Sequence, residues 1–401
     1  MDKTPVANRL HIGIFGRRNV GKSSFINALT GQNLAIVSAV PGTTTDPIYK
    51  TIEILPEPGP CVVIDTAGLD DVGSLGELRK EKTIQVLNKT DLAIVLLDPE
   101  IGAADFELHL VRTIKNKKIP IILVWNKIDL KQDFEQRLFS DDVVKGLPVY
   151  QVSSINCVGF DELKNSIVKH APSKIEDMAI VRGLVKKGDT VVLVIPIDDA
   201  MPKGRLILPE VQTLRSILDE DANAIVCKDY ELENTLKKLK NDPDLVITDS
   251  QVYNSVKDVV PAHVRLTSFS MLFARYKGDF KELVDGVKAI DGLHPGDRVL
   301  IAEACTHHSQ KDDIGRVKIP GLLNKKAGGA LVFEYAVAAD FKDDLSKYNI
   351  IIMCGSCMIN SAQVMSRLEK AKEAGVAVTN YGVVFAKMNG ILDRTGWLLN
   401  E

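Results

Sequence analysis

Short apolar runs alternate along this chain with segments whose apolar residues recur at helical spacing. The apolar runs predict β-strands over residues 11–15, 61–65, 121–125, 149–152, 191–197, 224–227, 245–248, 296–302, 330–335 and 348–353. The helical spacing predicts helices over residues 24–29, 160–170, 211–218, 231–239, 269–290 and 361–373. Because strands and helices alternate, the sequence predicts an α/β protein built on parallel sheets.

The 401 residues are enough for two or three domains. Ala171-Pro172-Ser173 follows a predicted helix and begins a linker, which predicts a first domain over residues 8–172. The renewed alternation of strands and helices predicts two smaller α/β domains, over residues 173–262 and 263–401. A polar turn, residues 198–205, interrupts the second of these and could be an oligomer contact or an active loop. No internal repeat is found in the sequence.

Net charge, the length of apolar runs and the cysteine count argue against several classes of protein. A net charge of −3 and the lack of a basic, aromatic-rich patch argue against a nucleic-acid partner. The longest apolar runs have the length of strands and are too short to cross a membrane. Six cysteines in a chain of this length do not form a disulfide framework, and the polar N-terminus has no signal-peptide pattern. We therefore expect a cytoplasmic protein.

The strongest motif is Gly16-Arg-Arg-Asn-Val-Gly-Lys-Ser23, which matches the phosphate-binding P-loop and joins a predicted strand to a predicted helix. A helix N-terminus offers unpaired N–H groups and a favourable dipole to a phosphate. Lys22 is expected to reach the β- and γ-phosphates, and the Ser23 hydroxyl to bind Mg²⁺. The residues expected to surround the nucleotide here are Gly16, Asn19, Val20, Gly21, Lys22, Ser23 and Ser24.

Two further segments complete a nucleotide switch. In the polar loop Thr43-Thr44-Thr45-Asp46, Thr44 is the favoured ligand for Mg²⁺ and sensor of the γ-phosphate. The predicted strand at residues 61–65 ends in Asp65, which can hold Mg²⁺ through water, and Gly68 N–H can bond the γ-phosphate. Loss of that bond on hydrolysis would release residues 69–77.

A base-binding motif follows the strand at residues 121–125. It reads Asn126-Lys127-Ile128-Asp129, and the Asp129 carboxylate can accept hydrogen bonds from guanine N1–H and N2–H₂, which adenine does not offer together. Ser153-Ser154 would place a backbone N–H near guanine O6. The ligand predicted from these residues is GTP or GDP with Mg²⁺.

These motifs, in this order, resemble the TrmE–Era–EngA group of GTPases. That resemblance implies a doubly wound, mostly parallel sheet with the nucleotide at the carboxyl ends of the strands. Leu69 stands where Ras-like proteins use glutamine to orient water, so slow hydrolysis is expected. GTP turnover is expected to be regulatory, because no substrate chemistry beyond hydrolysis is visible near the P-loop. Asn19 occupies the position of a K⁺ ligand in potassium-activated members, although it could equally be a turn residue. Arg17 and Arg18 are predicted to be solvated charges at the loop tip.

Cysteines gather at two strand ends in the last domain. Cys305-Thr-His307-His308 follows the strand at residues 296–302, and Cys354-Gly-Ser-Cys357 follows the strand at residues 348–353. A Cys₃His zinc site, a thioredoxin-like Cys354/Cys357 pair and an iron–sulfur cluster with a non-cysteine fourth ligand all fit these residues. Coincidental core cysteines are the alternative, which suits the remaining three cysteines, Cys61, Cys157 and Cys227, better.

The combination of these GTPase motifs, a middle α/β domain and a C-terminal Cys-x-His…Cys-x-x-Cys domain resembles the HydF family, the GTPase maturases of [FeFe]-hydrogenase. The resemblance implies a homodimer through the middle domain and a [4Fe–4S] cluster held by Cys305, Cys354 and Cys357. It further implies a diiron precursor with CO and cyanide ligands as cargo, two radical-SAM maturases and the hydrogenase apoprotein as partners.

The fourth cluster ligand is open, because Met353 stands where many relatives have histidine. His307 is slightly favoured over Asp312, and His308 and Asp313 also remain. The hypothesis is a GTPase scaffold that assembles or delivers the diiron subcluster. The alternatives are a GTP-dependent RNA or ribosome-assembly factor with structural zinc, and a dithiol redox protein.

Overall fold

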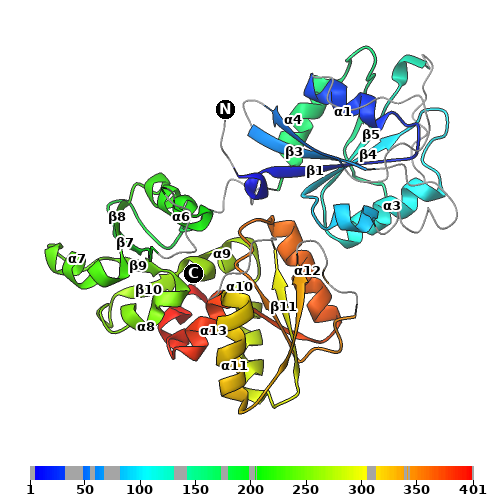
Figure 1. Ribbon diagram of the computed structural model, residues 1–401. Helices are drawn as coiled ribbons and strands as arrows, with labels where there is room; N and C mark the ends of the chain where they lie inside the picture. Colours follow the sequence, from blue (N-terminus) through cyan, green and yellow to red (C-terminus); the bar gives the residue numbers. More distant parts are fainter. Residues whose placement is uncertain are drawn as a thin grey trace. The chain divides into compact units, whose positions relative to one another are not determined.

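The computed structural model describes residues 5–31, 48–54, 59–66, 82–130, 142–172, 179–197, 204, 206–304, 313–337, 341 and 344–399. The chain divides into two compact units, Met1–Asp177 and Met178–Glu401 (Figure 1). Each unit is described by itself below. In the described part of the chain, no helix is long and apolar enough to cross a bilayer.

The first unit is built on a six-stranded sheet with the order β2-β3-β1-β4-β5-β6. Only β2 runs antiparallel to its neighbour; the other described pairs are parallel. The strands are β1 (Leu10–Phe15), β2 (Ile48–Ile54), β3 (Gly59–Asp65), β4 (Leu92–Leu97), β5 (Ile121–Trp125) and β6 (Val149–Gln151). The main helices are α1 (Lys22–Thr30), α3 (Asp105–Asn116) and α4 (Phe160–His170). The predicted α/β fold with a mostly parallel sheet is confirmed.

Helices cover both faces of this sheet, which explains its uninterrupted apolar runs. On one face, α1 and α4 bring the rings of Phe25 and Phe160 to a centroid distance of 5.5 Å over Ile12 and Ile14. On the other face, α3 packs against the neighbouring strands and buries its Ile114. The unit is therefore doubly wound, with polar strand ends collected at one edge.

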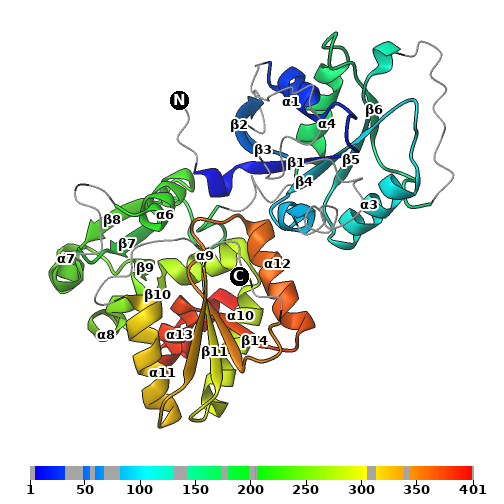
Figure 2. The same ribbon diagram turned by 45° about the vertical axis from the view of Figure 1, so that its right-hand side comes forward.

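The second unit contains two four-stranded parallel sheets (Figure 2). The first has the order β10-β9-β7-β8, made of β7 (Thr190–Val194), β8 (Asn223–Cys227), β9 (Leu245–Thr248) and β10 (Arg265–Ser268). Its helices are α6 (Leu208–Asp219), α7 (Leu232–Lys238) and α8 (Tyr253–Val256). Strand β10 was not predicted and lies beyond residue 262, so this sheet continues into the segment assigned to the last domain.

The second sheet has the order β12-β11-β13-β14. Its strands are β11 (Arg298–Glu303), β12 (Val332–Val337), β13 (Ile350–Met353) and β14 (Ala377–Asn380). The helices of this part are α9 (Phe269–Lys277), α10 (Phe280–Gly286), α11 (Ile319–Ala327), α12 (Ser361–Glu373), α13 (Tyr381–Met388) and α14 (Leu392–Thr395). Both sheets place their strands in the same order, with the first between the second and the third. This structural repeat has no counterpart that could be detected in the sequence.

One predicted helix is wrong in its extent. The single helix expected over residues 269–290 is divided into α9, α10 and a 3-10 segment, Val287–Gly292. Gly278 is extended, and the Asp279 side chain caps α10 by accepting from Glu282 N–H at 3.0 Å. The Gly-Asp pair therefore ends one helix and starts the next. Helix α12 approaches closely at this point, since a Cβ on Gly278 would lie 3.1 Å from Val364 Cγ1.

The two sheets of the second unit share a hydrophobic core. Alternate residues of β7 point to opposite faces, so Val191 joins this shared core and Val192 joins a smaller cluster beneath α7 and α8. The shared core continues through Met271 of α9 to Ile351 of β13. The middle and last segments therefore share one continuous core within the second compact unit.

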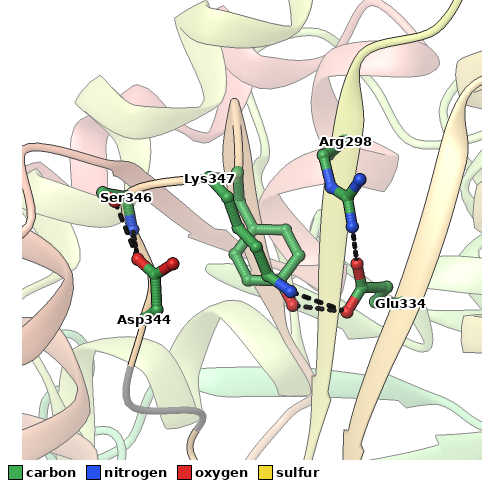
Figure 3. A network of polar contacts seen from close by, with 6 residues as sticks. Arg298, Glu334, Asp344, Ser346 and Lys347 are labelled. Carbon is green, nitrogen blue, oxygen red and sulfur yellow. Dashed lines mark hydrogen bonds and ion pairs between the residues drawn. The ribbon is translucent and has the colours of Figure 1, made fainter.

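A polar network ties together the amino-terminal edge of the second sheet (Figure 3). Glu334 of β12 pairs with Arg298 of β11 and, at 3.3 Å, with Lys347, which precedes β13. The Tyr348 hydroxyl donates to the same carboxylate at 2.8 Å. Three neighbouring chain segments therefore meet at one carboxylate on this edge, and the cysteines follow the strands at the opposite, carboxyl edge.

Candidate functional site

The predicted P-loop connects the buried strand β1 to α1. Its two glycines have positive φ values, 150° at Gly16 and 90° at Gly21. A Cβ on Gly21 would lie 2.6 Å from Asn126 Nδ2, and one on Gly16 would lie 2.9 Å from Leu96 O. Glycine is therefore required at both positions by conformation and by space.

Ser23, predicted to bind Mg²⁺, lies beside Asp65, predicted to hold Mg²⁺ through water, and Lys22 lies close to both. Lys22 is buried and donates to Gly16 O at 2.9 Å and Arg17 O at 2.7 Å, so its ammonium lies inside the curve of the loop. In the next position, Ser23 Oγ donates to Asp65 Oδ2 at 3.4 Å. Burial raises the pKa of Asp65, and the Lys22 charge opposes this rise. A hydroxyl beside a carboxylate is the hard oxygen donor set that Mg²⁺ prefers.

The other residues predicted to surround the nucleotide differ in their solvent exposure. Val20 is buried, Ser24 is half-buried at the start of α1, and Asn19 is exposed with a φ of 62°. Asparagine tolerates this left-handed conformation better than most residues, as expected for a turn position. Thr44, Gly68, Leu69 and the rest of residues 69–77 lie outside the described residues.

The prediction of solvated arginines in the P-loop is wrong. Arg17 and Arg18 are half-buried, and the Arg17 guanidinium forms a forked pair with Glu107, in which Nη2 donates to Oε2 at 3.0 Å. The same guanidinium lies 5.3 Å from the ring centroid of Phe106. The N-terminal turn of α3 brings both partners to the loop, so Arg17 anchors the P-loop to a neighbouring helix.

Asn126 joins three segments at the base-binding corner. Its side chain is buried, donates from Nδ2 to Val20 O at 2.9 Å and accepts from Ser154 Oγ at 2.7 Å. Lys127 has a φ of 63°, and its ammonium pairs with Asp98 at 2.8 Å. The P-loop and both base-binding motifs are thus connected by hydrogen bonds.

Asp129 is oriented by a serine. Ser153 Oγ donates to Asp129 Oδ1 at 2.5 Å. The predicted donor to guanine O6 is a backbone N–H of Ser153 or Ser154. The Ser153 N–H already donates to Val158 O at 3.1 Å, so it is not available to the base. Ser154 is then the remaining candidate of the predicted pair.

The cysteine pair lies at the point where the strand order of the last sheet reverses. Strands β11 and β13 are parallel neighbours, and the two cysteine groups follow them. Cys354 Sγ accepts from Ala304 N–H at 3.1 Å, so the residue before Cys305 contacts the first thiol of the pair. Open α/β sheets bind their ligands at this topological position. Cys305 itself lies outside the described residues.

A buried lysine supports the loop of the pair. Lys277 Nζ donates to Ser356 O at 3.1 Å, Cys357 O at 3.1 Å and Ile359 O at 2.8 Å. Burial lowers the pKa of Lys277 to about 8, although the charges of Cys357 and Cys354 act to raise it. Burial also raises the pKa of the Cys357 thiol, with a further contribution from Cys354, against the effect of Lys277.

The candidates for a fourth cluster ligand are only partly described. His307, His308 and Asp312 lie outside the described residues. Asp313 is nearly buried, and its Oδ1 accepts from Arg316 N–H at 2.8 Å as the cap of a π-helical turn. Arg316 also pairs with buried Glu303 at 2.9 Å. Within the described ranges, no group of three or more His, Cys, Asp or Glu side chains could hold a metal ion.

The other cysteines separate into three environments. Cys61 is a core cysteine as predicted, and burial raises its pKa to about 12. Cys157, predicted to lie in the loop on the guanine side, is exposed there with a φ of 54°. Cys227 is half-buried, because β8 is the edge strand of its sheet and not a buried strand as predicted.

Three residues of these sites were missed from the sequence. Asp98 follows the apolar strand β4, and an acid at a strand end was a usable signal. Glu107 lies in the first turn of α3, where an acid is common for capping alone. Lys277 is far along the chain from the cysteine pair, and no local pattern connects them.

Comparison with protein families separates the chain into three parts. Residues 11–127 match a model described as 50S ribosome-binding GTPase. Residues 180–278 match the Hydrogen maturase F dimerization domain, and residues 281–396 match the Hydrogen maturase F tetramerization domain. These two adjacent matches take up most of the second unit.

Curated relatives match the first part only. The tRNA modification GTPase MnmE of Thermoanaerobacter sp. (strain X514) is 38% identical over 161 residues, which are 39% of this chain and 34% of that protein. GTPase Der of Acidithiobacillus ferrooxidans (strain ATCC 53993 / BNL-5-31) is 35% identical over 169 residues, 39% of this chain and 36% of that protein. The chain therefore spans about a third of the length of these relatives.

Among solved structures, a point variant of Aquifex aeolicus Era bound to GDP.AlF4- is similar with a TM-score of 0.37 and 22% identity, covering 54% of this chain and 92% of that one. By sequence, the GTPase domain is related to those of MnmE and Der. With this domain followed by both hydrogen maturase F domains, the chain belongs to the hydrogen maturase F (HydF) family as a HydF-type GTPase.

Proposed function

We propose that this chain is a GTP-hydrolysing scaffold that holds a [4Fe–4S] cluster and assembles or delivers the diiron precursor of [FeFe]-hydrogenase. The partners in this proposal are the hydrogenase apoprotein and two radical-SAM maturases. The observation that carries it is the cysteine pair at the switch point of the last sheet, with Ala304 N–H 3.1 Å from Cys354 Sγ. Because open α/β sheets bind ligands at this position, the two cysteines are better explained as ligands of a bound group than as structural core residues.

The nucleotide half of the proposal follows from the P-loop contacts. Lys22 would neutralise the β- and γ-phosphate charge, and Ser23 would bind Mg²⁺ directly, with Asp65 acting through water. Thr44 would complete the metal site and Gly68 would contact the γ-phosphate. GTP hydrolysis would then be slow, because Leu69 cannot orient water, and regulatory, because the P-loop has no other substrate chemistry beside it.

Guanine selection would depend on Asp129. Its Oδ1 already accepts from Ser153, which fixes the carboxylate for guanine N1–H and N2–H₂. Ser154 N–H would bond guanine O6, and Asn126 would hold this corner against the P-loop through Val20. Lys127, paired with Asp98, would line the base.

We expect Asp129→Asn to weaken GTP binding by roughly 100-fold or more, because a charged acceptor shared by two guanine donors is replaced. Xanthine nucleotides should gain affinity, since an amide can donate to the oxygen at position 2. Isothermal titration with GDP and XDP measures both changes.

The control for Asp129→Asn is Asp142→Asn, which makes the same change at a carboxylate whose side chain is 87% exposed. It should leave both affinities unchanged. Unaltered GDP affinity in Asp129→Asn would remove this residue from the base site.

Potassium should stimulate hydrolysis about tenfold over sodium at matched ionic strength, because a cation near the phosphates offsets developing charge. Asn19→Gly should abolish the difference, since glycine accepts the φ of 62° and removes only the amide. Steady-state rates in KCl and NaCl test this. Equal wild-type rates in the two salts would exclude potassium activation, and a persistent difference in Asn19→Gly would exclude Asn19 as its ligand.

The cluster half of the proposal uses three thiolates, from Cys305, Cys354 and Cys357. A [4Fe–4S] cluster bound in this way would supply one iron with an exchangeable ligand, suited to carrying a second metal unit. His307 is slightly favoured as that ligand over Asp312. Asp313 fits less well, because it caps the turn at Arg316. The family-implied homodimer through the middle sheet is part of the same proposal.

Anaerobic purification followed by metal analysis and absorption spectroscopy tests the proposal. Iron and sulfide with iron–sulfur absorption would support it. Zinc with no visible absorption would favour a GTPase with a structural metal site, and a metal-free protein with a titratable Cys354/Cys357 dithiol would favour redox chemistry. Either of these two outcomes would overturn the scaffold proposal.

A further inference from the structure

Lys277 is the last residue of α9, and its side chain is buried, with 3% of the residue exposed. Its ammonium has three hydrogens, and three backbone carbonyls accept them, at Ser356, Cys357 and Ile359. All three acceptors lie on the loop that carries the cysteine pair. One side chain from another part of the fold therefore holds this loop through three hydrogen bonds.

The position of α9 allows the Lys277 side chain to contact the cysteine loop. Gly278 follows directly, and a Cβ added to it would lie 3.1 Å from Val364 and 3.4 Å from Leu368, two side chains of α12. The helix that begins after the cysteine loop, α12, thus packs closely against the end of α9. The ring of Phe273 lies 5.5 Å from Lys277 Nζ and covers the ammonium on another side.

Three carbonyls satisfy the hydrogen bonds of an ammonium but carry no compensating full charge. A buried cation normally needs an anionic partner, because its desolvation costs several kcal/mol. The acidic groups that act on Lys277 are the thiols of Cys357 and Cys354, the predicted ligands of an anionic cluster. Lys277 therefore places its ammonium against the loop that carries the two cysteines.

We propose that Lys277 is a positioning residue of the cluster site, which holds the cysteine loop through three carbonyls and raises the reduction potential of a bound cluster through its charge. This inference rests on the proposed [4Fe–4S] function and extends it. Lys277 lies in the residues that match the dimerization domain, and the cysteine pair lies in those that match the tetramerization domain. The first of these domains thus contributes directly to the cluster site of the second.

The test uses the full chain, reconstituted anaerobically with ferrous iron and sulfide. Lys277→Gln removes the charge and keeps an amide donor, whereas Lys277→Arg keeps the charge. Reduction adds negative charge to a cluster, so loss of a nearby cation should make the midpoint potential more negative. We expect a lowered potential and about tenfold faster iron release to a chelator in Lys277→Gln, the size of effect seen for groups that support metal ligands. Lys277→Arg should keep the wild-type potential.

The matched control is Lys281→Gln on the neighbouring helix α10, where the lysine side chain is 80% exposed and pairs with Asp285. It should change neither the potential nor iron release. Should Lys277→Gln not fold by circular dichroism, Lys277→Met, an uncharged chain of similar length, takes its place with the same expectation.

The outcomes separate this inference from the proposed function. A wild-type protein that binds no iron–sulfur cluster would overturn both. A wild-type cluster with the same potential in the uncharged variant would overturn the role of Lys277 alone. Iron loss without a change of potential in the remaining cluster would overturn the electrostatic role and leave Lys277 as a support for the fold of the loop.

Discussion

Lys22→Ala is expected to reduce kcat/KM for GTP by at least about 100-fold, because it removes a preorganised cation from the developing phosphate charge. The ammonium is held within the P-loop by Gly16 O and Arg17 O, where the motif predicts the phosphates to bind. Iron content should be unchanged, since Lys22 and the cysteine pair belong to different compact units. Phosphate release and iron analysis on the same preparation measure both.

Lys145→Ala serves as the control, because this lysine belongs to the same unit and its side chain is 74% exposed. It should hydrolyse GTP at the wild-type rate. Full activity in Lys22→Ala would remove the P-loop from catalysis, and loss of iron in that variant would mean that the two units are not independent.

Cys354→Ser and Cys357→Ser should each lose most of the bound iron, with at least about a 100-fold loss of affinity expected for a removed metal ligand. Serine is nearly isosteric with cysteine but is a poor ligand for iron in these clusters. Cys305→Ser should behave in the same way. Iron and sulfide analysis, with the EPR spectrum of the reduced protein, measures the loss, while GTP hydrolysis should be retained.

Cys227→Ser is the matched control, since Cys227 is half-buried on the edge strand of the other sheet. It should keep its iron. His307→Ala and Asp312→Ala should also keep the cluster, and whichever residue is the fourth ligand should alter the EPR spectrum and the binding of added imidazole. A full iron complement in any one of the three cysteine variants would exclude the three-thiolate site.

Much of the fold could be predicted because its determinants are local in sequence. Four elements have the bounds that were predicted: strands β5 and β9 and helices α4 and α12. In each, the apolar pattern stops at a polar residue or a helix cap. The P-loop was predictable for the same reason. Its motif residues are consecutive in sequence and its glycines have positive φ values. The groups that leave no space for a Cβ, Leu96 O beside Gly16 and Asn126 Nδ2 beside Gly21, are distant in sequence and were not predictable.

The sequence also located the cysteine pair at a strand end, because parallel strands present their carboxyl ends at one edge. It did not determine which strands are neighbours. The pairing of β11 with β13, which brings Ala304 to Cys354, depends on the order of the sheet. Strand β10 was missed because only Leu266 of its four residues is apolar, so its pairing with β9 identifies it.

Tertiary structure alone decided the contacts between residues far apart in sequence. Arg17 was predicted to be solvated because a charge in a loop usually is, and only the packing of α3 supplies Glu107. Cys227 was predicted to be buried because its strand is apolar, and only the sheet order makes that strand an edge. Lys277 meets the cysteine loop because α9 packs against α12. Local sequence determines each element and its ends, but burial and charge pairing depend on which elements share a face.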